Sequence, residues 1–249
     1  MSTSLRYLVL SDIHASLDAL DAVLAAADGS WDRVLVLGDL VGYGAEPNAV
    51  IDRIRALDPV AVIRGNHDKA SCGLDDGGNF NQVARFAAAW TEQQLTPDNR
   101  RYLRELPQGP TEIDERLVIC HGAPFDEDHY IFDAVDAQRS FQAASRPVCV
   151  FGHTHLPVVF SARGTQLAAD IPEADLQMLK FEPGVHYLVN PGSVGQPRDG
   201  DPRAAYAIVD VAAKHVELFR LDYPVDIAQA KVVEAGLPPV LARRLAVGR

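Results

Sequence analysis

The 249-residue sequence has few cysteines, and their positions do not suggest crosslinking. Cys72, Cys120 and Cys149 are too few and too scattered for a disulfide framework, and none belongs to a C-x-x-C pair. Cys120 and Cys149 lie inside apolar runs, so we interpret both as small core residues rather than thiolate ligands. The cysteine usage therefore indicates a reducing compartment.

Long apolar stretches and an excess of positive charge are also missing. No run approaches the roughly 20 residues that span a bilayer, and the first residues lack the apolar segment of a signal peptide. We therefore expect a cytoplasmic protein without a membrane partner. The net charge of −11 argues against a polymeric nucleic-acid partner, because such proteins usually present a basic face. A small substrate fits better, and a homo-oligomer remains open.

What the composition contains is sufficient for a folded core. Hydrophobic residues make up 47% of the chain and charged residues 23%, close to an average soluble globular protein. No internal repeat, low-complexity tract or linker divides the sequence. We therefore predict one domain that spans residues 1–249.

Five apolar runs, at 7–10, 33–37, 60–63, 117–120 and 147–151, each end in polar residues. The runs are continuous rather than alternating, which favours strands buried on both faces. Several of these apolar runs are followed by residues at helical spacing. Ser16 and Pro47 are candidate helix starts, and the spacing of Val83, Phe86 and Trp90 predicts a helix with its aromatic residues in the core. With a more strand-rich region from 158 to 221, the pattern predicts an α/β fold.

The polar residues after these runs are of the kinds that bind metal ions. They comprise two carboxylates, one amide and five of the eight histidines: Asp12, Asp39, Asn66, His14, His67, His121, His153 and His155. Groups that follow separate strands of an α/β sheet can converge at the carboxyl ends of those strands. Oxygen and nitrogen donors without a thiolate suit Mn²⁺, Fe, Co²⁺, Ni²⁺ or Zn²⁺ better than Ca²⁺ or a structural zinc. The remaining histidines, His129, His186 and His215, are interpreted as ordinary surface or hydrogen-bonded residues.

Taken singly these motifs are weak, since Gly65-Asn66-His67-Asp68 alone is typical of a turn. As an ordered set they resemble the calcineurin-like metallophosphoesterases, over about Leu5 to Val211. The matching motifs are Asp12-Ile13-His14, Gly38-Asp39, Gly65-Asn66-His67-Asp68, His121 and Gly152-His153-Thr154-His155. The resemblance implies a sandwich of two β-sheets flanked by helices, in four α/β/β/α layers, with a dinuclear metal centre at the strand ends.

The resemblance also implies a division of the ligands between two divalent ions. Asp12, His14, Asp39 and His155 would hold one, and Asp39, Asn66, His121 and His153 the other. We favour Mn²⁺, with Fe, Ni²⁺, Co²⁺ and Zn²⁺ as alternatives. Two nearby cations repel and need a shared anionic ligand, the role implied for Asp39. The two metals would lower the pKa of a water that bridges them, so that the water is present as hydroxide. This hydroxide is the expected nucleophile.

One histidine of the set is left without a metal. His67 is the candidate catalytic residue, as a proton or hydrogen-bond donor to the leaving group. Within the same motif, Gly65 is interpreted as permitting a sharp backbone change and Asp68 as supporting the loop.

The segment 38–44, Gly-Asp-Leu-Val-Gly-Tyr-Gly, departs from the branch of protein Ser/Thr phosphatases and symmetrical dinucleoside tetraphosphatases. In that branch an acidic or small residue and then Arg-Gly follow the Gly-Asp motif. Here Tyr43 stands in place of the arginine, and position 42 lacks the acid that partners the catalytic histidine in the protein phosphatases. The chain instead resembles the small prokaryotic phosphodiesterase branch. What orients His67 is left open.

Candidate substrate-binding residues are Tyr43, Ser193 and Arg198. The last two lie in the strand-to-loop passage 190–198, for which a Gly/Pro turn is an equal alternative. Phe125, His129 and Tyr130 follow His121 and could cover a base or aryl group, although a surface loop is favoured. The basic residues Arg243, Arg244 and Arg249 are interpreted as a solvated face.

The function expected from these residues is metal-dependent hydrolysis of small phosphodiesters or nucleotides. A phosphomonoesterase or a diadenosine-polyphosphate hydrolase would use the same centre. A metal-free protein-binding scaffold of the same fold is the alternative from another class. A scaffold is expected to lose ligands, whereas every ligand position here is filled.

Overall fold

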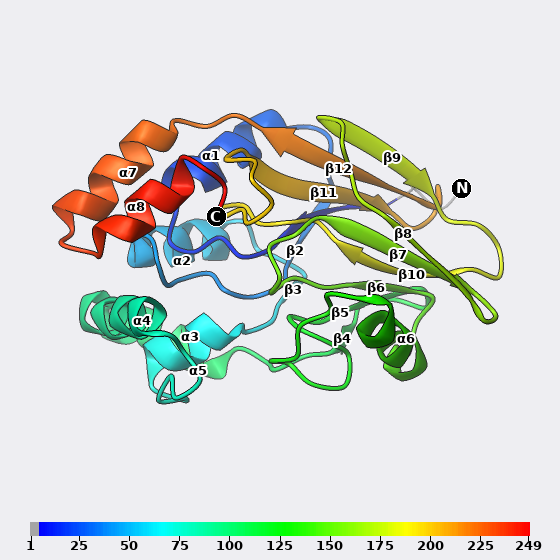
Figure 1. The fold of residues 1–249 in the computed structure, drawn as a ribbon, viewed down its shortest axis with the longest axis horizontal. Helices are drawn as coiled ribbons and strands as arrows, with labels where there is room; N and C mark the ends of the chain where they lie inside the picture. Colours follow the sequence, from blue (N-terminus) through cyan, green and yellow to red (C-terminus); the bar gives the residue numbers. More distant parts are fainter. Residues whose placement is uncertain (1–4) are drawn as a thin grey trace.

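The computed structural model describes residues 5–249 and arranges their strands in two mixed sheets (Figure 1). The first sheet has the order β3 (Ala61–Val62), β2 (Arg33–Val36), β1 (Arg6–Leu10), β11 (Ala204–Asp210), β12 (His215–Leu221) and β9 (Leu176–Lys180). The second has the order β4 (Thr111–Glu112), β5 (Leu117–Ile119), β6 (Val148–Val150), β10 (His186–Asn190), β7 (Val158–Arg163) and β8 (Gln166–Asp170).

Helices flank both sheets. They are α1 (Leu17–Ala26), α2 (Pro47–Ala56), α3 (Asn66–Cys72), α4 (Gln82–Gln94), α5 (Pro97–Glu105), α6 (Ala134–Ala143), α7 (Val225–Glu234) and α8 (Pro239–Leu245). One apolar cluster joins the first sheet to residues of α1, α2, α4, α5, α7 and α8, and another joins the second sheet to α6. The four-layer sandwich expected from the sequence is confirmed.

The continuous apolar runs have a structural reason, because both faces of the inner strands are covered. Along β1, Leu8 and Leu10 face the helices, whereas Tyr7 and Val9 belong to the cluster between the two sheets. Full burial of such a side chain stabilises the fold by about 1.5–3 kcal/mol. Cys120 and Cys149 are free and buried in the core on the α6 side, as expected.

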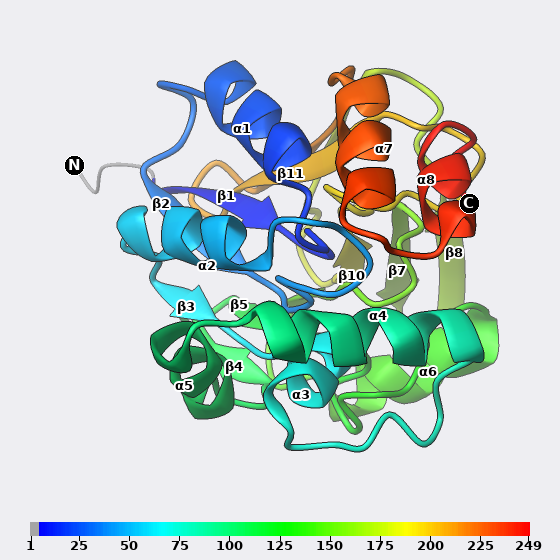
Figure 2. The ribbon, with the colours of Figure 1, turned by 90° about the vertical axis from the view of Figure 1, so that its left-hand side faces the viewer.

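Strand direction brings the polar strand ends together. β1, β2 and β3 are parallel neighbours, and so are β5, β6 and β10. The loops after β1 and β2 are joined by hydrogen bonds, since Asp12 N donates to Gly38 O (3.1 Å) and His14 N to Asp39 O (2.9 Å). In Figure 2 the light-blue segment between β2 and α2 passes between α7 above and α4 below.

One local expectation is wrong, and another is confirmed only in part. Phe86 is 50% exposed, because α4 buries its small side chains Ala84, Ala87 and Ala88. Ser16 does mark the start of α1, but among the described residues its hydroxyl makes no cap hydrogen bond, since its backbone (φ −98°, ψ 86°) departs from the extended geometry of capping residues.

Four elements have no individual counterpart in the sequence-based expectations. The Gly65–Asp68 motif opens helix α3 rather than forming only a turn. Helix α6 and the largely exposed edge strands β8 and β9 lack strong apolar patterns. Among residues 5–249, no helix is both long and apolar enough to cross a bilayer.

Candidate metal centre

Two groups of buried side chains meet at the strand ends. One consists of Asp12, His14, Asp39 and His155, and the other of Asp39, His121 and His153; within each, the ligand atoms lie within 4.8 Å of one another. Asp39 belongs to both groups, because its Oδ2 lies 3.6 Å from Nε2 of both His14 and His121. The arrangement could therefore hold two ions that share one carboxylate.

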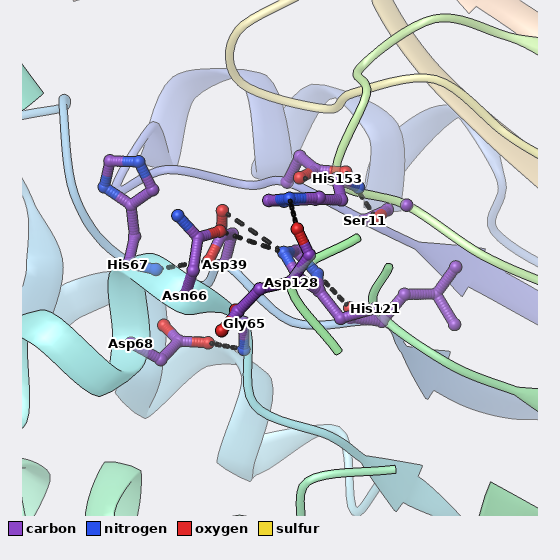
Figure 3. Close-up of polar contacts among 12 residues, drawn as sticks. Ser11, Asp39, Gly65, Asn66, His67, Asp68, His121, Asp128 and His153 are labelled. Atoms are coloured by element: carbon purple, nitrogen blue, oxygen red, sulfur yellow. Dashed lines mark hydrogen bonds and ion pairs between the residues drawn. The ribbon is translucent and has the colours of Figure 1, made fainter. Parts of the chain in front are cut away.

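Asn66 adjoins the second group. Its Oδ1 lies 3.2 Å from His121 Nε2, and dashed lines in Figure 3 connect both Asn66 and Asp39 to His121. Because Asn66 is the first residue of α3, the amide reaches the centre from the helix that begins where β3 ends. The structure thus brings together all seven residues proposed as ligands from the sequence.

The protonated nitrogen of three imidazoles is set by backbone carbonyls. The Nδ1 atoms are paired as follows: His14 with Val41 O (3.0 Å), His121 with Leu37 O (2.7 Å) and His155 with Gln196 O (2.6 Å). A carbonyl can only accept, so Nδ1 carries the proton in each neutral ring. Nε2 is then left with a free lone pair that faces the centre, as a metal ligand requires.

His153 uses the opposite nitrogen. Its Nε2 donates to Asp128 O (3.1 Å), which leaves Nδ1 for the centre (Figure 3). The loop that carries Asp128 is held by the buried Lys69 ammonium, whose Nζ lies 2.7 Å from Asp128 Oδ2 and 3.0 Å from Glu127 Oε1. An ion pair on α3 therefore helps to fix the ring orientation of His153.

The donor set fits cations. His14 Nε2 and His155 Nε2 are 3.2 Å apart, and with both Nδ1 atoms protonated their lone pairs face each other, which is unfavourable unless an electrophile lies between them. Burial lowers the pKa values of both histidines, which keeps the rings neutral. Burial and the nearby Asp12 raise the pKa of Asp39 well above its usual range, so a cation is needed to keep both carboxylates ionised.

The backbone at the centre is strained. Among residues 5–249, nine non-glycine residues have positive φ, and six of them are Asp12, His14, Asp39, Tyr43, His153 and His155. Such conformations cost about 1–3 kcal/mol each and persist only where the surroundings enforce them. Here the enforcing contacts are the hydrogen bonds between loops, which aim the side chains inward.

His67 is held by packing rather than by an acid. Its ring lies 4.3 Å from the Tyr43 ring and 4.5 Å from the Phe80 ring, which stacks on it, while its edge meets His14 at 4.9 Å, all between centroids. Among the described residues, Nδ1 of this buried ring has no hydrogen-bond partner. In Figure 3, His67 lies on the opposite side of Asp39 from His121. Aromatic contacts take the place of the acid that is missing at position 42.

Two glycines make room for these groups. Gly42 has φ +87°, and a Cβ there would lie 2.5 Å from His67 Nδ1. A Cβ on Gly65 would lie 2.1 Å from Asp39 Oδ1, but its φ of −105° is open to any residue. The sequence-based interpretation that Gly65 permits a sharp backbone change is therefore wrong, because what the site requires there is space.

Asp68 supports the loops, in keeping with the sequence-based interpretation. Its buried carboxylate accepts from the backbone N–H groups of Gly65 (3.0 Å) and Val41 (3.2 Å). Burial and the charge of Asp39 raise its pKa to about 7. Asp68 thus connects the start of α3 to the segment that carries Gly42 and Tyr43.

The three substrate-binding candidates differ in what they contact. Ser193 is fully buried, and its hydroxyl donates to Asp12 O (2.7 Å) and accepts from Gln196 N (2.8 Å), which favours the structural alternative. Arg198 and Tyr43 face each other, with Nη2 3.5 Å from Oη. These two remain candidates.

The three ring-bearing residues after His121 also differ in what they contact. The ring of Tyr130 stacks on His153 with centroids 3.8 Å apart, so it borders the centre. Phe125 instead lies under Arg139, and His129 pairs with Asp136 (3.0 Å). Only Tyr130 of the three contacts a proposed ligand.

Sequence reasoning missed two residues near the site. Phe80 lies at the end of an irregular Gly- and Asp-rich loop, where no periodicity reveals its contact with His67. Arg244 was interpreted as a solvated residue, but the structure packs it half-buried against Tyr43. Arg244 is far in sequence from every motif, so no sequence pattern connected it with the site.

Comparisons with known proteins agree with this geometry. Residues 5–214 match the model of the calcineurin-like phosphoesterase superfamily domain. An uncharacterized protein of Methanocaldococcus jannaschii is 35% identical over 247 residues, 97% of each chain. The phosphodiesterase YfcE of Escherichia coli is 25% identical over 218 residues, 83% of this chain and 88% of the relative.

A solved structure is similar over nearly the whole length. The crystal structure of a metallophosphoesterase from Sphaerobacter thermophilus has a TM-score of 0.88 and 42% identity, covering 99% of this chain and 100% of that one. With the match of the superfamily model across most of the sequence, these findings establish that the chain belongs to the calcineurin-like phosphoesterase superfamily.

Proposed function

We propose that this protein is a dinuclear-metal-dependent hydrolase of small phosphodiesters or nucleotides. The observation that carries the proposal is the shared position of Asp39, whose Oδ2 is equidistant, at 3.6 Å, from a histidine of each ligand group. Asp12, His14 and His155 would complete one site, and Asn66, His121 and His153 the other. We propose Mn²⁺ as the resident ion, with Fe, Ni²⁺, Co²⁺ and Zn²⁺ as alternatives.

Two bound ions would supply Lewis acidity toward the phosphoryl oxygens and an activated water as nucleophile. The chain's own contribution is to hold the donors rigidly. Backbone carbonyls fix the protonated nitrogen of each ligand ring, and the burial of the carboxylates keeps water from competing for them. Little rearrangement is then needed when a phosphoester binds.

His67 is proposed to stabilise or protonate the leaving oxygen. Burial and the charge of Arg198 lower its pKa, so the free ring is neutral and offers one N–H donor. An anionic phosphoester beside it favours the protonated form and turns the ring into an acid when substrate is present. Its backbone N–H donates to Asp39 Oδ1 (2.9 Å), which links its position to the centre.

The preference for diesters is supported by the absence of an arginine at position 43 and by the similarity to the Escherichia coli phosphodiesterase. The test compares turnover of bis-p-nitrophenyl phosphate with that of p-nitrophenyl phosphate in Mn²⁺. We expect the diester to be hydrolysed faster. A faster monoester would replace the diesterase with a phosphomonoesterase, and a protein that binds no transition metal on elemental analysis would revive the scaffold alternative.

A further inference from the structure

Two arginines from distant parts of the chain converge on one tyrosine beside the candidate centre. Arg198 comes from the loop after β10, and Arg244 from α8. The Cζ atom of each lies 5.8 Å from the centroid of the Tyr43 ring. We call these three residues the arginine clamp.

The positive charge of the clamp is not neutralised by acidic side chains. Among residues 5–249, no aspartate or glutamate forms an ion pair with either guanidinium group. Arg198 Nη2 lies 3.3 Å from the neutral Gln196 Oε1, and its buried Nε has no hydrogen-bond partner in the described part of the chain. Arg244 Nε donates to the Arg249 backbone oxygen (2.6 Å).

Other buried or half-buried arginines of the chain are treated differently. Arg203 pairs with Asp201 (2.7 Å) and Asp175 (2.5 Å), and Arg220 pairs with Asp199. Burial, followed by the charge of Arg198, lowers the pKa of Arg244. Two neighbouring arginines that lack an aspartate or glutamate as ion-pair partner among residues 5–249, in a protein of net charge −11, indicate a binding place for an anion.

The clamp lies on the His67 side of the centre. The Tyr43 ring that both arginines approach is 4.3 Å from the His67 ring and 4.8 Å from the His14 ring. Tyr130, which stacks on His153 in the second ligand group, also approaches Arg198. If His67 faces the leaving oxygen, then the clamp faces the rest of the leaving group.

We propose that Arg198, Tyr43 and Arg244 bind a second phosphoryl group, carried by the leaving group of the substrate. This inference rests on the proposed function, because the leaving-group side is defined by the role of His67. Guanidinium groups match phosphate oxygens with paired, charge-assisted hydrogen bonds, and the tyrosine hydroxyl adds a further donor. A diester with an uncharged leaving group would leave the clamp unpaired, so the preferred substrate carries two separate phosphoryl groups.

The test measures binding rather than turnover. Calorimetry with the Mn²⁺-loaded protein compares methylphosphonate with α,ω-bisphosphonates of one to four methylene groups, which bracket the unknown spacing. We expect one of the bisphosphonates to bind at least about tenfold more tightly than methylphosphonate. Arg244→Gln and Arg198→Gln should each remove most of that advantage while changing methylphosphonate affinity less than about twofold. The metal content is measured after each titration, so that chelation is not mistaken for binding.

Arg243→Gln is the matched control. Arg243 neighbours Arg244 on α8 but is exposed, so its removal deletes the same charge without touching Tyr43. The control should bind both ligand types as the unsubstituted protein does. Thermal melts establish that all three variants are folded.

Three outcomes overturn the inference. Equal weakening of methylphosphonate and bisphosphonate in Arg244→Gln would place the clamp on the scissile phosphoryl group. Unchanged binding in both arginine variants, or equal weakening by Arg243→Gln, would remove the clamp as a specific site. Hydrolysis of bis-p-nitrophenyl phosphate, measured in parallel, reports separately on the proposed function, which can hold when the clamp fails.

Discussion

The histidines around the centre are held in two different ways. The rings of His14, His121 and His155 each donate Nδ1–H to a backbone carbonyl, which fixes the nitrogen that faces the centre. Within residues 5–249, His67 has no such bond at Nδ1 and is held by the rings of Tyr43 and Phe80. A metal ligand needs one lone pair in one place, whereas a group that exchanges a proton must change its protonation state. The difference in support therefore separates the two proposed roles.

The largest expected effect comes from removing the residue shared by both ligand groups. In Asp39→Ala we expect binding of both metals to be abolished and hydrolysis to fall to background, because the two cations lose their common anion. Elemental analysis of the purified variant measures this. The exposed Asp76→Ala serves as a control for loss of one acidic charge. Retention of one ion at full occupancy would show that Asp39 does not bridge.

Removing the packed ring should separate catalysis from metal binding. In His67→Ala we expect a turnover lower by roughly 10²-fold or more at near-normal metal content, because the leaving oxygen loses its donor. Steady-state kinetics and elemental analysis are measured on the same preparation. Loss of metal in this variant would place His67 among the ligands and would contradict the distinction between His67 and the other histidines.

A methyl group added at Gly42 tests whether packing sets the ring position. The new Cβ would lie 2.5 Å from His67 Nδ1, so we expect the ring to shift and turnover to fall by about tenfold or more. The control is Gly29→Ala, which has a similar φ of +73° but no neighbour within 4 Å. Both variants should lose about 1–2 kcal/mol of stability from the backbone alone, measured by denaturant unfolding. Equal turnover in the two would contradict a role for the close approach to His67.

The smallest effect is expected from removing the stacking partner. An aromatic contact contributes about 0.5–1.5 kcal/mol, so Phe80→Ala should lower turnover by up to about tenfold, with metal content unchanged. Phe86→Ala is the matched control, since Phe86 is 50% exposed on the nearby α4. A reduction of the same size in both variants would assign the effect to general loss of aromatic surface.

Much of the centre could be predicted because its signal is local in sequence. An apolar run such as 7–10 followed by Asp12 and His14 marks a strand and the donors at its end without reference to other segments. The same holds for 33–36 with Asp39, and convergence then follows from the parallel strand order. The orientation of His67 could not be predicted in this way. Phe80 lies in an irregular loop, and its contact with His67 depends on how that loop packs over α3.

The roles of Arg244 and Gly65 also could not be predicted from the sequence. Arg244 is an ordinary helical arginine in the sequence, and only the packing of α8 places it beside Tyr43. Gly65 suggested backbone freedom, whereas its neighbour Asp39 shows that the requirement is space. In both cases the deciding contact joins segments that are far apart in the chain.

The sequence by itself determined an α/β fold, the identity of the donors and the strand ends at which they lie, because burial on both faces and ligand chemistry are evident from residue types and short spacings. The two-sheet sandwich came from the resemblance of the ordered motifs to a known family. Only the tertiary structure decided which nitrogen each imidazole presents, that His67 is held by aromatic rings, and that an arginine of α8 reaches the site. These features arise from contacts between distant segments, and such contacts exist only once the two sheets and their helices have packed together.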